Sequence, residues 1–189
     1  MQTTKILLSA ILVSTTASHA RLKENLDQCD SRYGKPIYQH SQDDMEYRSY
    51  KLSGRRIQVV FHKKVSAMEM ITTELESVYS EEQVSKFGAE SIKFIRGLLS
   101  SAYGFSEEQL VDLTKFRRKS AEVTSSMATN GSIRAGCSIE SNQEQTSAKV
   151  VATLIDTGAA KEIRRIIDFG ANAVVLEAKG NETKAAEGF

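Results

Sequence analysis

The chain has 189 residues, of which 40% are hydrophobic, 26% charged and 7% aromatic, with one proline and no tryptophan. This composition is typical of a globular domain and excludes collagen, low-complexity linkers and disulfide-dense miniproteins. There are 25 lysines and arginines and 24 aspartates and glutamates, so the formal net charge of +1 provides no attraction to nucleic acid or to an anionic membrane. The length favours a single domain with a sizeable core.

The first twenty residues have the pattern of a cleaved signal peptide. Lys5 precedes an apolar run over residues 6–13, and Ser18 and Ala20 occupy the small-residue positions before a cut that would leave Arg21 as the new N-terminus. The run is too short to cross a bilayer, which requires about 20 apolar residues. No cysteine follows the run closely enough to carry a lipid. We therefore expect a secreted or periplasmic protein without a membrane span.

Three segments follow from this prediction. Residues 1–20 form the signal peptide, residues 21–179 the folded domain, and residues 180–189 a polar, small-residue tail that we expect to be mobile. Removing the signal peptide takes away Lys5 and leaves no formal net charge.

The domain is expected to begin with a helix and an antiparallel meander. A helical stripe is formed by Leu22, Leu26, Cys29 and Tyr33, and it is followed by the stop signals Gly34 and Pro36. Residues 41–45 are polar and are predicted to be a loop. Apolar alternation then predicts strands over 46–52, 55–62 and 65–72, joined by tight turns at Ser53-Gly54 and at His62-Lys63-Lys64.

Two helices are predicted next, over 80–100 and 106–118. Each begins with Ser-Glu-Glu-Gln, a capping box in which the serine and the glutamine satisfy orphan backbone amides. The first helix would bury a stripe that includes Phe87, and the second a stripe that ends at Phe116.

The remaining segments return to strands. Residues 119–131 are rich in Ser, Thr, Asn and Gly and are predicted to be a loop, and alternation over 133–139 and 148–154 predicts two paired strands. A short helix capped by Asp156 or Thr157 and closed by Gly170 would precede a short strand over 173–176. Strands, helices and then strands predict an α+β fold, an antiparallel sheet meander packed against helices.

The sequence offers little catalytic or metal-binding chemistry. After the signal peptide only His40 and His62 remain, the first in a polar loop and the second at a hairpin end, and neither stands in a catalytic motif. Together with Cys29 and Cys137 they match no metal-ligand spacing. We expect no catalytic residue, no metal and no cofactor.

Other short motifs are explained without a function. Asp168-Phe169-Gly170 matches the magnesium-binding triplet of protein kinases, but the other kinase motifs are missing, so it is a chance match. Paired basic residues occur at 55–56, 63–64, 117–118 and 164–165. Because they are balanced by acidic residues and lack interleaved aromatic residues, we expect solvated surfaces and not nucleic-acid binding.

Cys29 and Cys137 are a candidate disulfide. Their even number and the expected export permit a bridge. It would constrain a long loop and contribute about 4–5 kcal/mol by the chain-entropy estimate. Two separate buried thiols are the alternative, since free cysteine is among the most buried residue types.

The opening Leu22-x-x-x-Leu26-x-x-Cys29-x-x-Arg32-Tyr33-Gly34-Lys35-Pro36, placed after a signal peptide, resembles that of small uncharacterised exported bacterial proteins with a Cys-x-x-Arg-Tyr-Gly-x-Pro motif. That resemblance covers the N-terminal third and implies no known activity. A weaker resemblance is to periplasmic domains of outer-membrane-assembly lipoproteins, which also place a helix ending in Gly-x-Pro before an antiparallel sheet. Those proteins carry a lipid-modified N-terminal cysteine that this chain lacks.

Two functions remain open at this point. The first is an exported, non-catalytic binding or interaction module with an unknown ligand, whose partner could be an envelope protein. The alternative is an exported hydrolase-like enzyme of unrecognised type. A pocket that holds His40 or His62 beside a carboxylate would favour the enzyme, and a shallow surface would favour the binding module.

Overall fold

The computed structural model describes residues 22–76, 114–118, 121–142, 147–159 and 162–186, with scattered positions between 82 and 105. The expected signal peptide, Phe87 and residues 106–113 of the second expected helix lie outside the described residues. Within the described part, none of the helices is both long and apolar enough to cross a bilayer.

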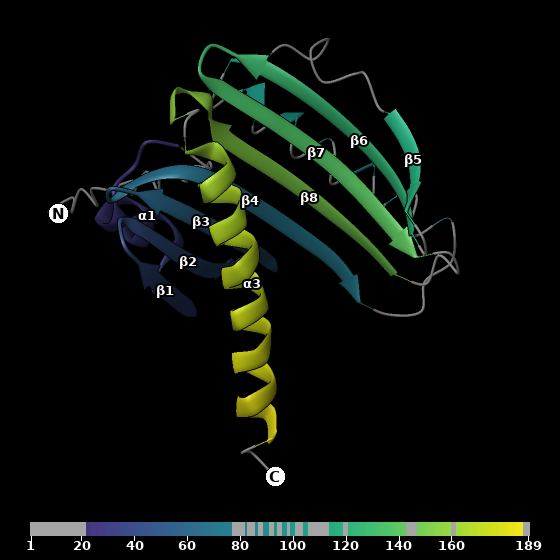
Figure 1. Ribbon diagram of the computed structural model, residues 1–189. Helices are drawn as coiled ribbons and strands as arrows, with labels where there is room; N and C mark the ends of the chain where they lie inside the picture. The colour runs from purple at the N-terminus through teal and green to yellow at the C-terminus, as the bar shows by residue number, and fades with distance from the viewer. Residues whose placement is uncertain are drawn as a thin grey trace, which may run out of the picture.

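The fold is α+β, as expected, and its framework is one antiparallel sheet. The sheet order is β1-β2-β3-β4-β8-β7-β6-β5, and every neighbouring pair is antiparallel. Two four-stranded meanders thus meet where β4 lies beside β8 (Figure 1). The strands are β1 (Tyr38–Gln42), β2 (Met45–Leu52), β3 (Arg55–His62), β4 (Val65–Glu76), β5 (Thr114–Arg118), β6 (Ala121–Asn130), β7 (Ile133–Asn142) and β8 (Ser147–Asp156).

Helices pack on both faces of the first meander. On one face, α1 (Leu26–Tyr33) contributes Cys29 and Tyr33 to a core with Ile57, Val59 and Phe61 of β3. On the other face lies α3 (Ile163–Ala186), which follows the 3₁₀ turn η2 (Thr157–Ala159). The residues that form this second core are Met45, Tyr47, Val60, Ala67, Met68, Ile166, Phe169 and Ala173.

Local sequence explains the first meander. Gly34 (φ 85°) ends α1, and two-residue turns at Ser53-Gly54 and Lys63-Lys64 have both central residues at positive φ, which suits the twist of a hairpin. The predicted strands and turns are confirmed here. The predicted loop over 41–45 is wrong: β1 pairs with β2 from Tyr38 opposite Ser49 to Gln42 opposite Met45, leaving only Asp43-Asp44 as the turn.

The helix over 80–100 agrees with the structure wherever its residues are described. Those positions are helical, and Gly104 (φ 65°) donates its N–H to the carbonyl of Ser100, a left-handed C-cap. Leu99 and Phe105 are buried in the core under α1, so this segment also covers that face.

The predicted helix over 106–118 and loop over 119–131 are wrong where the structure describes them. Residues 114–118 form β5, and β6 pairs with β7 from Ala121 opposite Asn142 to Asn130 opposite Ile133. The Ser- and Thr-rich composition concealed β6, because a strand of this kind gains its stability from pairing with a neighbour more than from its own propensity.

The predicted short helix, closing Gly170 and strand over 173–176 are also wrong. One helix, α3, continues to Ala186, so most of the expected tail over 180–189 is helical. Gly170 lies inside the helix, against the sheet. A Cβ at this position would be 2.8 Å from Met68 Cε and 3.1 Å from Val60 Cγ2, so this glycine serves close helix–sheet packing and does not end the helix.

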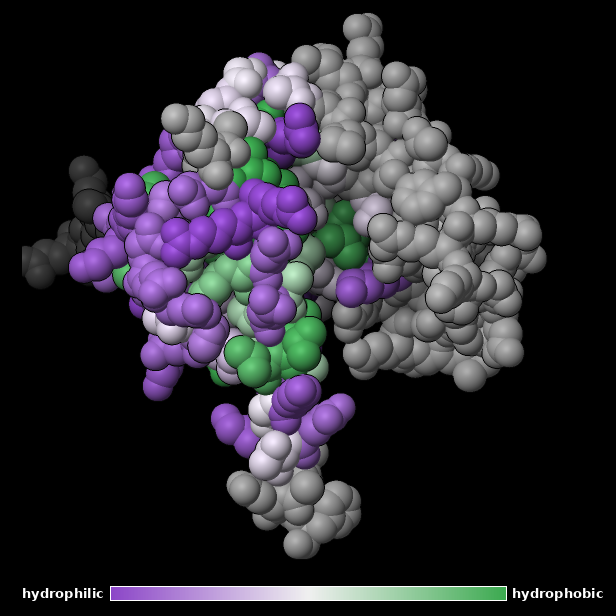
Figure 2. Space-filling view, viewed as in Figure 1, coloured by the Kyte–Doolittle hydropathy of each residue, from purple (hydrophilic) through white to green (hydrophobic). Residues whose placement is uncertain are grey.

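The C-terminal part of α3 projects past the strands and away from the body of the protein (Figure 1). Where the helix leaves the body, hydrophobic residues gather on the visible surface (Figure 2). Val175 and Leu176 are the exposed large hydrophobic residues of this part of the helix.

Candidate functional site

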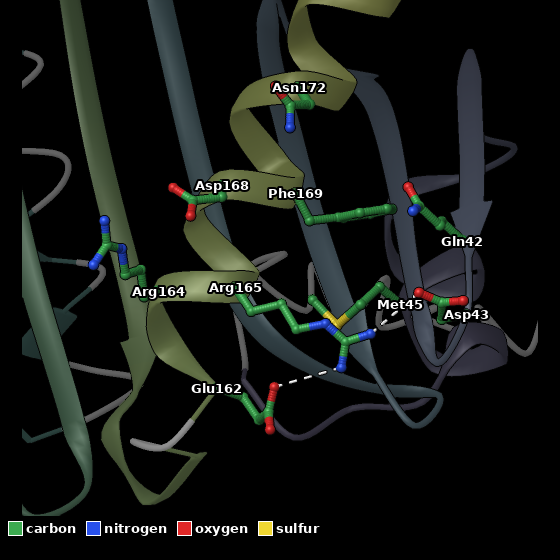
Figure 3. A pocket seen from close by; sticks show the side chains of 9 residues that line it. All are labelled: Gln42, Asp43, Met45, Glu162, Arg164, Arg165, Asp168, Phe169 and Asn172. Atoms are coloured by element: carbon green, nitrogen blue, oxygen red, sulfur yellow. Dashed lines mark hydrogen bonds and ion pairs between the residues drawn. The ribbon is translucent and has the colours of Figure 1, made fainter.

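A pocket of about 510 Å³ lies between the β1–β2 turn and the first half of α3 (Figure 3). Residues 42–45 supply one wall and residues 162–172 supply the other, so the pocket joins segments that are far apart in the sequence. It is lined by Gln42, Asp43, Met45, Glu162, Arg164, Arg165, Asp168, Phe169 and Asn172.

Arg165 crosses the pocket and is held by carboxylates from both walls. Its Nη2 lies 3.3 Å from Asp43 Oδ2 and 3.0 Å from Asp44 Oδ1, and its Nη1 lies 3.5 Å from Glu162 Oε2. With three carboxylates around one guanidinium, the charge of Arg165 is already compensated. An anionic ligand would therefore gain little from this arginine.

The apolar part of the pocket is Phe169 with Met45. Phe169 projects from α3 toward Gln42 (Figure 3), and its ring stacks on His40 with a centroid distance of 5.7 Å and an interplanar angle of 16°. His40 is thus a half-buried member of β1, and the predicted loop position is wrong. It contacts the lining residue Phe169 and is not itself among the lining residues.

His62 lies at a hairpin end, as expected, and is paired with Asp44. His62 Nε2 is 2.9 Å from Asp44 Oδ2. Burial alone would raise the pKa of Asp44, but the hydrogen bond with His62 and the nearby charge of Arg165 hold that pKa below its ordinary value. The pair links the β1–β2 turn to the end of β3, and His62 does not line the pocket.

A second polar cluster holds the middle of α3 against the sheet. Glu177 is almost fully buried and accepts hydrogen bonds from Tyr47 Oη at 2.8 Å, Ser49 Oγ at 3.1 Å and Arg56 Nη1 at 2.9 Å. Gln58 Nε2 donates to Tyr47 Oη at 2.7 Å. Burial and the hydrogen bond with Glu177 raise the pKa of Tyr47. Because every partner is a strand residue beneath the helix, this cluster anchors α3 and offers no open site.

A third cluster lies under α1 and contains Cys29, one of the two cysteines of the candidate disulfide. Glu69 of β4 is fully buried and accepts a hydrogen bond from Tyr33 Oη at 2.6 Å, while its Oε2 has no hydrogen-bond partner. Arg32 and Glu24 form an ion pair beside it, with Arg32 Nε 2.9 Å from Glu24 Oε2. Burial, followed by the charges of Glu69 and Glu24, raises the pKa of Cys29 to about 12.

Cys29 is a free, fully buried thiol in the structure. The backbone of Cys137 stands opposite Ala152 in the β7–β8 register, and its side chain lies outside the described residues. The candidate disulfide between Cys29 and Cys137 therefore stays a prediction. The free thiol of Cys29 is what the alternative, two separate buried thiols, would give. Across the described ranges, no three His, Cys, Asp or Glu residues gather as a metal site.

Sequence reasoning missed the pocket. Asp168-Phe169, part of a chance match to the kinase triplet, and Arg164-Arg165, expected to be a solvated pair, all line the pocket. One sequence signal could have indicated this wall of the pocket: Arg164, Asp168 and Asn172 are four residues apart and so share one face of a helix. The predicted helix end at Gly170 placed Asn172 outside that helix.

Comparison with known proteins gives no family. No family model matches the chain, and no curated protein matches it. Among solved structures, the chain is similar to a cysteine-rich secretory protein of Staphylococcus aureus, at 11% sequence identity and a TM-score of 0.39. That match covers 76% of this chain and 47% of the other, so the chain spans about half the length of the neighbour.

Proposed function

We propose that this protein is an exported, non-catalytic binding module, located in the periplasm or secreted, and that the pocket between the β1–β2 turn and α3 is its binding site. The observation that carries this proposal is the chemistry of the pocket lining. Its nine residues combine one aromatic ring with amide, carboxylate and guanidinium groups and include no serine, threonine, cysteine or histidine. Such a lining can select a ligand, and it lacks the Ser–His and Cys–His pairs of nucleophilic hydrolases.

The enzymatic alternative has less support. His62 has a carboxylate partner in Asp44, as a catalytic base often does, but that carboxylate is shared with Arg165 and neither His62 nor His40 lines the pocket. Export itself rests on the residue pattern of 1–20. N-terminal sequencing of exported material should give Arg21, and an intact Met1 in that fraction would refute cleavage.

The binding function can be tested with one charge reversal and a matched control. Asp168→Arg changes an exposed pocket residue on α3, and Glu182→Arg makes the same change on the same helix, outside the pocket. We expect a partner captured from envelope extracts by the wild-type protein to be lost with Asp168→Arg and retained with Glu182→Arg. Equal capture by both variants would place the binding site elsewhere.

A further inference from the structure

β1 is an outer strand of the sheet, and its sequence lacks the features that usually prevent an edge from pairing with another chain. Its residues, Tyr-Gln-His-Ser-Gln, include no charge and no proline, and its register with β2 is continuous from Tyr38 to Gln42. At the opposite edge, β5 is Thr-Lys-Phe-Arg-Arg, with three cationic residues. One edge therefore carries the usual charge protection, and the β1 edge does not.

The hairpin geometry indicates which backbone groups of β1 face outward. Asp43-Asp44 is a two-residue turn, and in such a hairpin the flanking pair, here Gln42 and Met45, is hydrogen-bonded. Hydrogen-bonded and non-hydrogen-bonded pairs alternate along an antiparallel ladder. The N–H and C=O groups of Gln39 and Ser41 thus point away from β2. Both residues are exposed.

The edge leads directly into the pocket. On the face of β1 toward α3, Tyr38 packs against the core, His40 stacks on Phe169 and Gln42 lines the pocket. A strand placed beside β1 would direct alternate side chains to this same face, because side chains alternate along a strand. One of them would reach the pocket beside Phe169.

The charge of the pocket indicates what that side chain is. Asp43, Glu162 and Asp168 oppose Arg164 and Arg165, and Arg165 also pairs with Asp44 from outside the lining. Carboxylates therefore outnumber cations in a pocket that is also lined by the aromatic ring of Phe169. This combination suits a lysine or arginine side chain, which carboxylates and aromatic rings both attract.

We propose that β1 accepts an extended segment of a partner polypeptide as an additional strand of the sheet, with a basic side chain of that segment in the pocket. This inference rests on the proposed binding function of the pocket and names its class of ligand. Main-chain hydrogen bonds to Gln39 and Ser41 supply affinity, and the pocket supplies selectivity.

A proline at an outward-facing position tests the strand pairing directly. Ser41→Pro removes one outward N–H and none of the bonds to β2, and proline is tolerated on edge strands where its nitrogen faces away from the sheet. Ser41→Thr is the matched control, because it keeps the N–H. Peptides methylated on alternate backbone nitrogens test the same bonds from the ligand side, should Ser41→Pro fail to fold.

The probes are decapeptides selected from a random library on the purified exported protein and then synthesised. We expect the selected peptides to contain a lysine or arginine, flanked by residues of high β-propensity at alternate positions. Affinity should fall at least tenfold with Ser41→Pro, with backbone methylation in one of the two alternating patterns, and with glutamate in place of the basic residue. Ser41→Thr should bind as the wild type does.

Failure of the strand-pairing proposal can be distinguished from failure of the proposed binding function of the pocket. Peptides that bind Ser41→Pro normally but lose affinity for Asp168→Arg would overturn strand pairing and leave the pocket as the binding site. If the library yields no binder while a captured partner still depends on Asp168, the strand-addition proposal is wrong and the pocket function stands. A concentration-dependent dimer abolished by Ser41→Pro would assign the edge to a second copy and overturn the proposed ligand.

Discussion

At the scale of single residues, Glu69 is a fully buried carboxyl with a raised pKa. Burial is the main cause that raises its pKa to about 7, and the charge of Glu24 acts in the same direction. The hydrogen bond from Tyr33 and the charge of Arg32 oppose the shift. A carboxyl with a raised pKa is favoured in its protonated form, so burial outweighs the hydrogen bond and the charge that favour the ionised form.

The sign of the pH dependence follows from this shift. The folded protein holds the Glu69 proton up to about pH 7, whereas the unfolded chain releases it near 4.5. The free energy of unfolding should therefore fall as pH rises from about 4.5 to 7, by an amount on the order of 3 kcal/mol. Denaturant unfolding at a series of pH values measures this fall.

Glu69→Gln should remove that dependence, because the amide is neutral at every pH. The variant should be more stable than the wild type at pH 8 and similar to it at pH 4. Glu182→Gln, at the exposed end of α3, is the control and should leave the pH profile unchanged. A Glu69→Gln profile that parallels the wild type would show that another group causes the dependence.

Cys29 provides a second residue-scale prediction. Because it is fully buried and its pKa is raised to about 12, its thiolate is scarce and inaccessible at neutral pH. We expect native protein to resist alkylation at Cys29 and denatured, unreduced protein to react there. Protection that persists after denaturation and disappears on reduction, in protein that is monomeric without reductant, would instead establish the bridge to Cys137.

At the scale of elements, the hairpins combine favourable and strained turns. Ser53-Gly54 places a glycine at positive φ, whereas Lys63 (φ 52°) and Lys64 (φ 67°) adopt the same region with side chains. A left-handed conformation costs a residue with a Cβ about 1 kcal/mol. The β3–β4 turn is therefore held in place by the strands that it joins.

Lys64→Gly should stabilise the protein by about 1 kcal/mol, because glycine adopts positive φ without that cost. Gly54→Lys is the reciprocal change at the matching position of the β2–β3 turn and should destabilise the protein by a similar amount. Thermal unfolding of the two variants gives both values. If Lys64→Gly were less stable than the wild type, the Lys64 side chain would stabilise the folded protein by more than its backbone strain costs.

The two glycines within α3 have different roles. Gly170 faces Met68 and Val60 at contact distance, whereas no atom lies within 4 Å of a Cβ built at Gly180. Gly170→Leu should destabilise the protein by about 1–3 kcal/mol through overpacking. Gly180→Leu should be neutral or stabilising by up to about 1 kcal/mol, because it improves helix propensity in solvent. Equal melting temperatures would contradict the close approach of α3 to the sheet.

At the scale of the whole molecule, two clusters decide how the helices meet the sheet. Glu177 ties α3 to β2 and β3 through Tyr47, Ser49 and Arg56, and Glu69 ties β4 to α1 through Tyr33. Both are polar groups inside apolar layers, and such groups fix an orientation because any other arrangement leaves them buried without partners. The pocket depends on this arrangement, since one of its walls is α3.

The parts of the fold that rest on local chemistry could be predicted from the sequence. Alternation over 55–62, the glycine at 54 and the stop at Gly34 each act within a few residues of chain, and the structure agrees with all three. The antiparallel class followed from short turns between alternating segments, which leave no length for a crossover.

The remaining features depend on contacts between distant parts of the chain. β6 forms because β7 lies beside it, and Gly170 stays inside a helix because the sheet lies against it; neither cause is present in the local sequence. The pocket likewise joins residues 42–45 to residues 162–172. Pairing and packing between distant segments outweigh local propensities of a few tenths of a kcal/mol per residue, so the elements that shape the site took their form from neighbours.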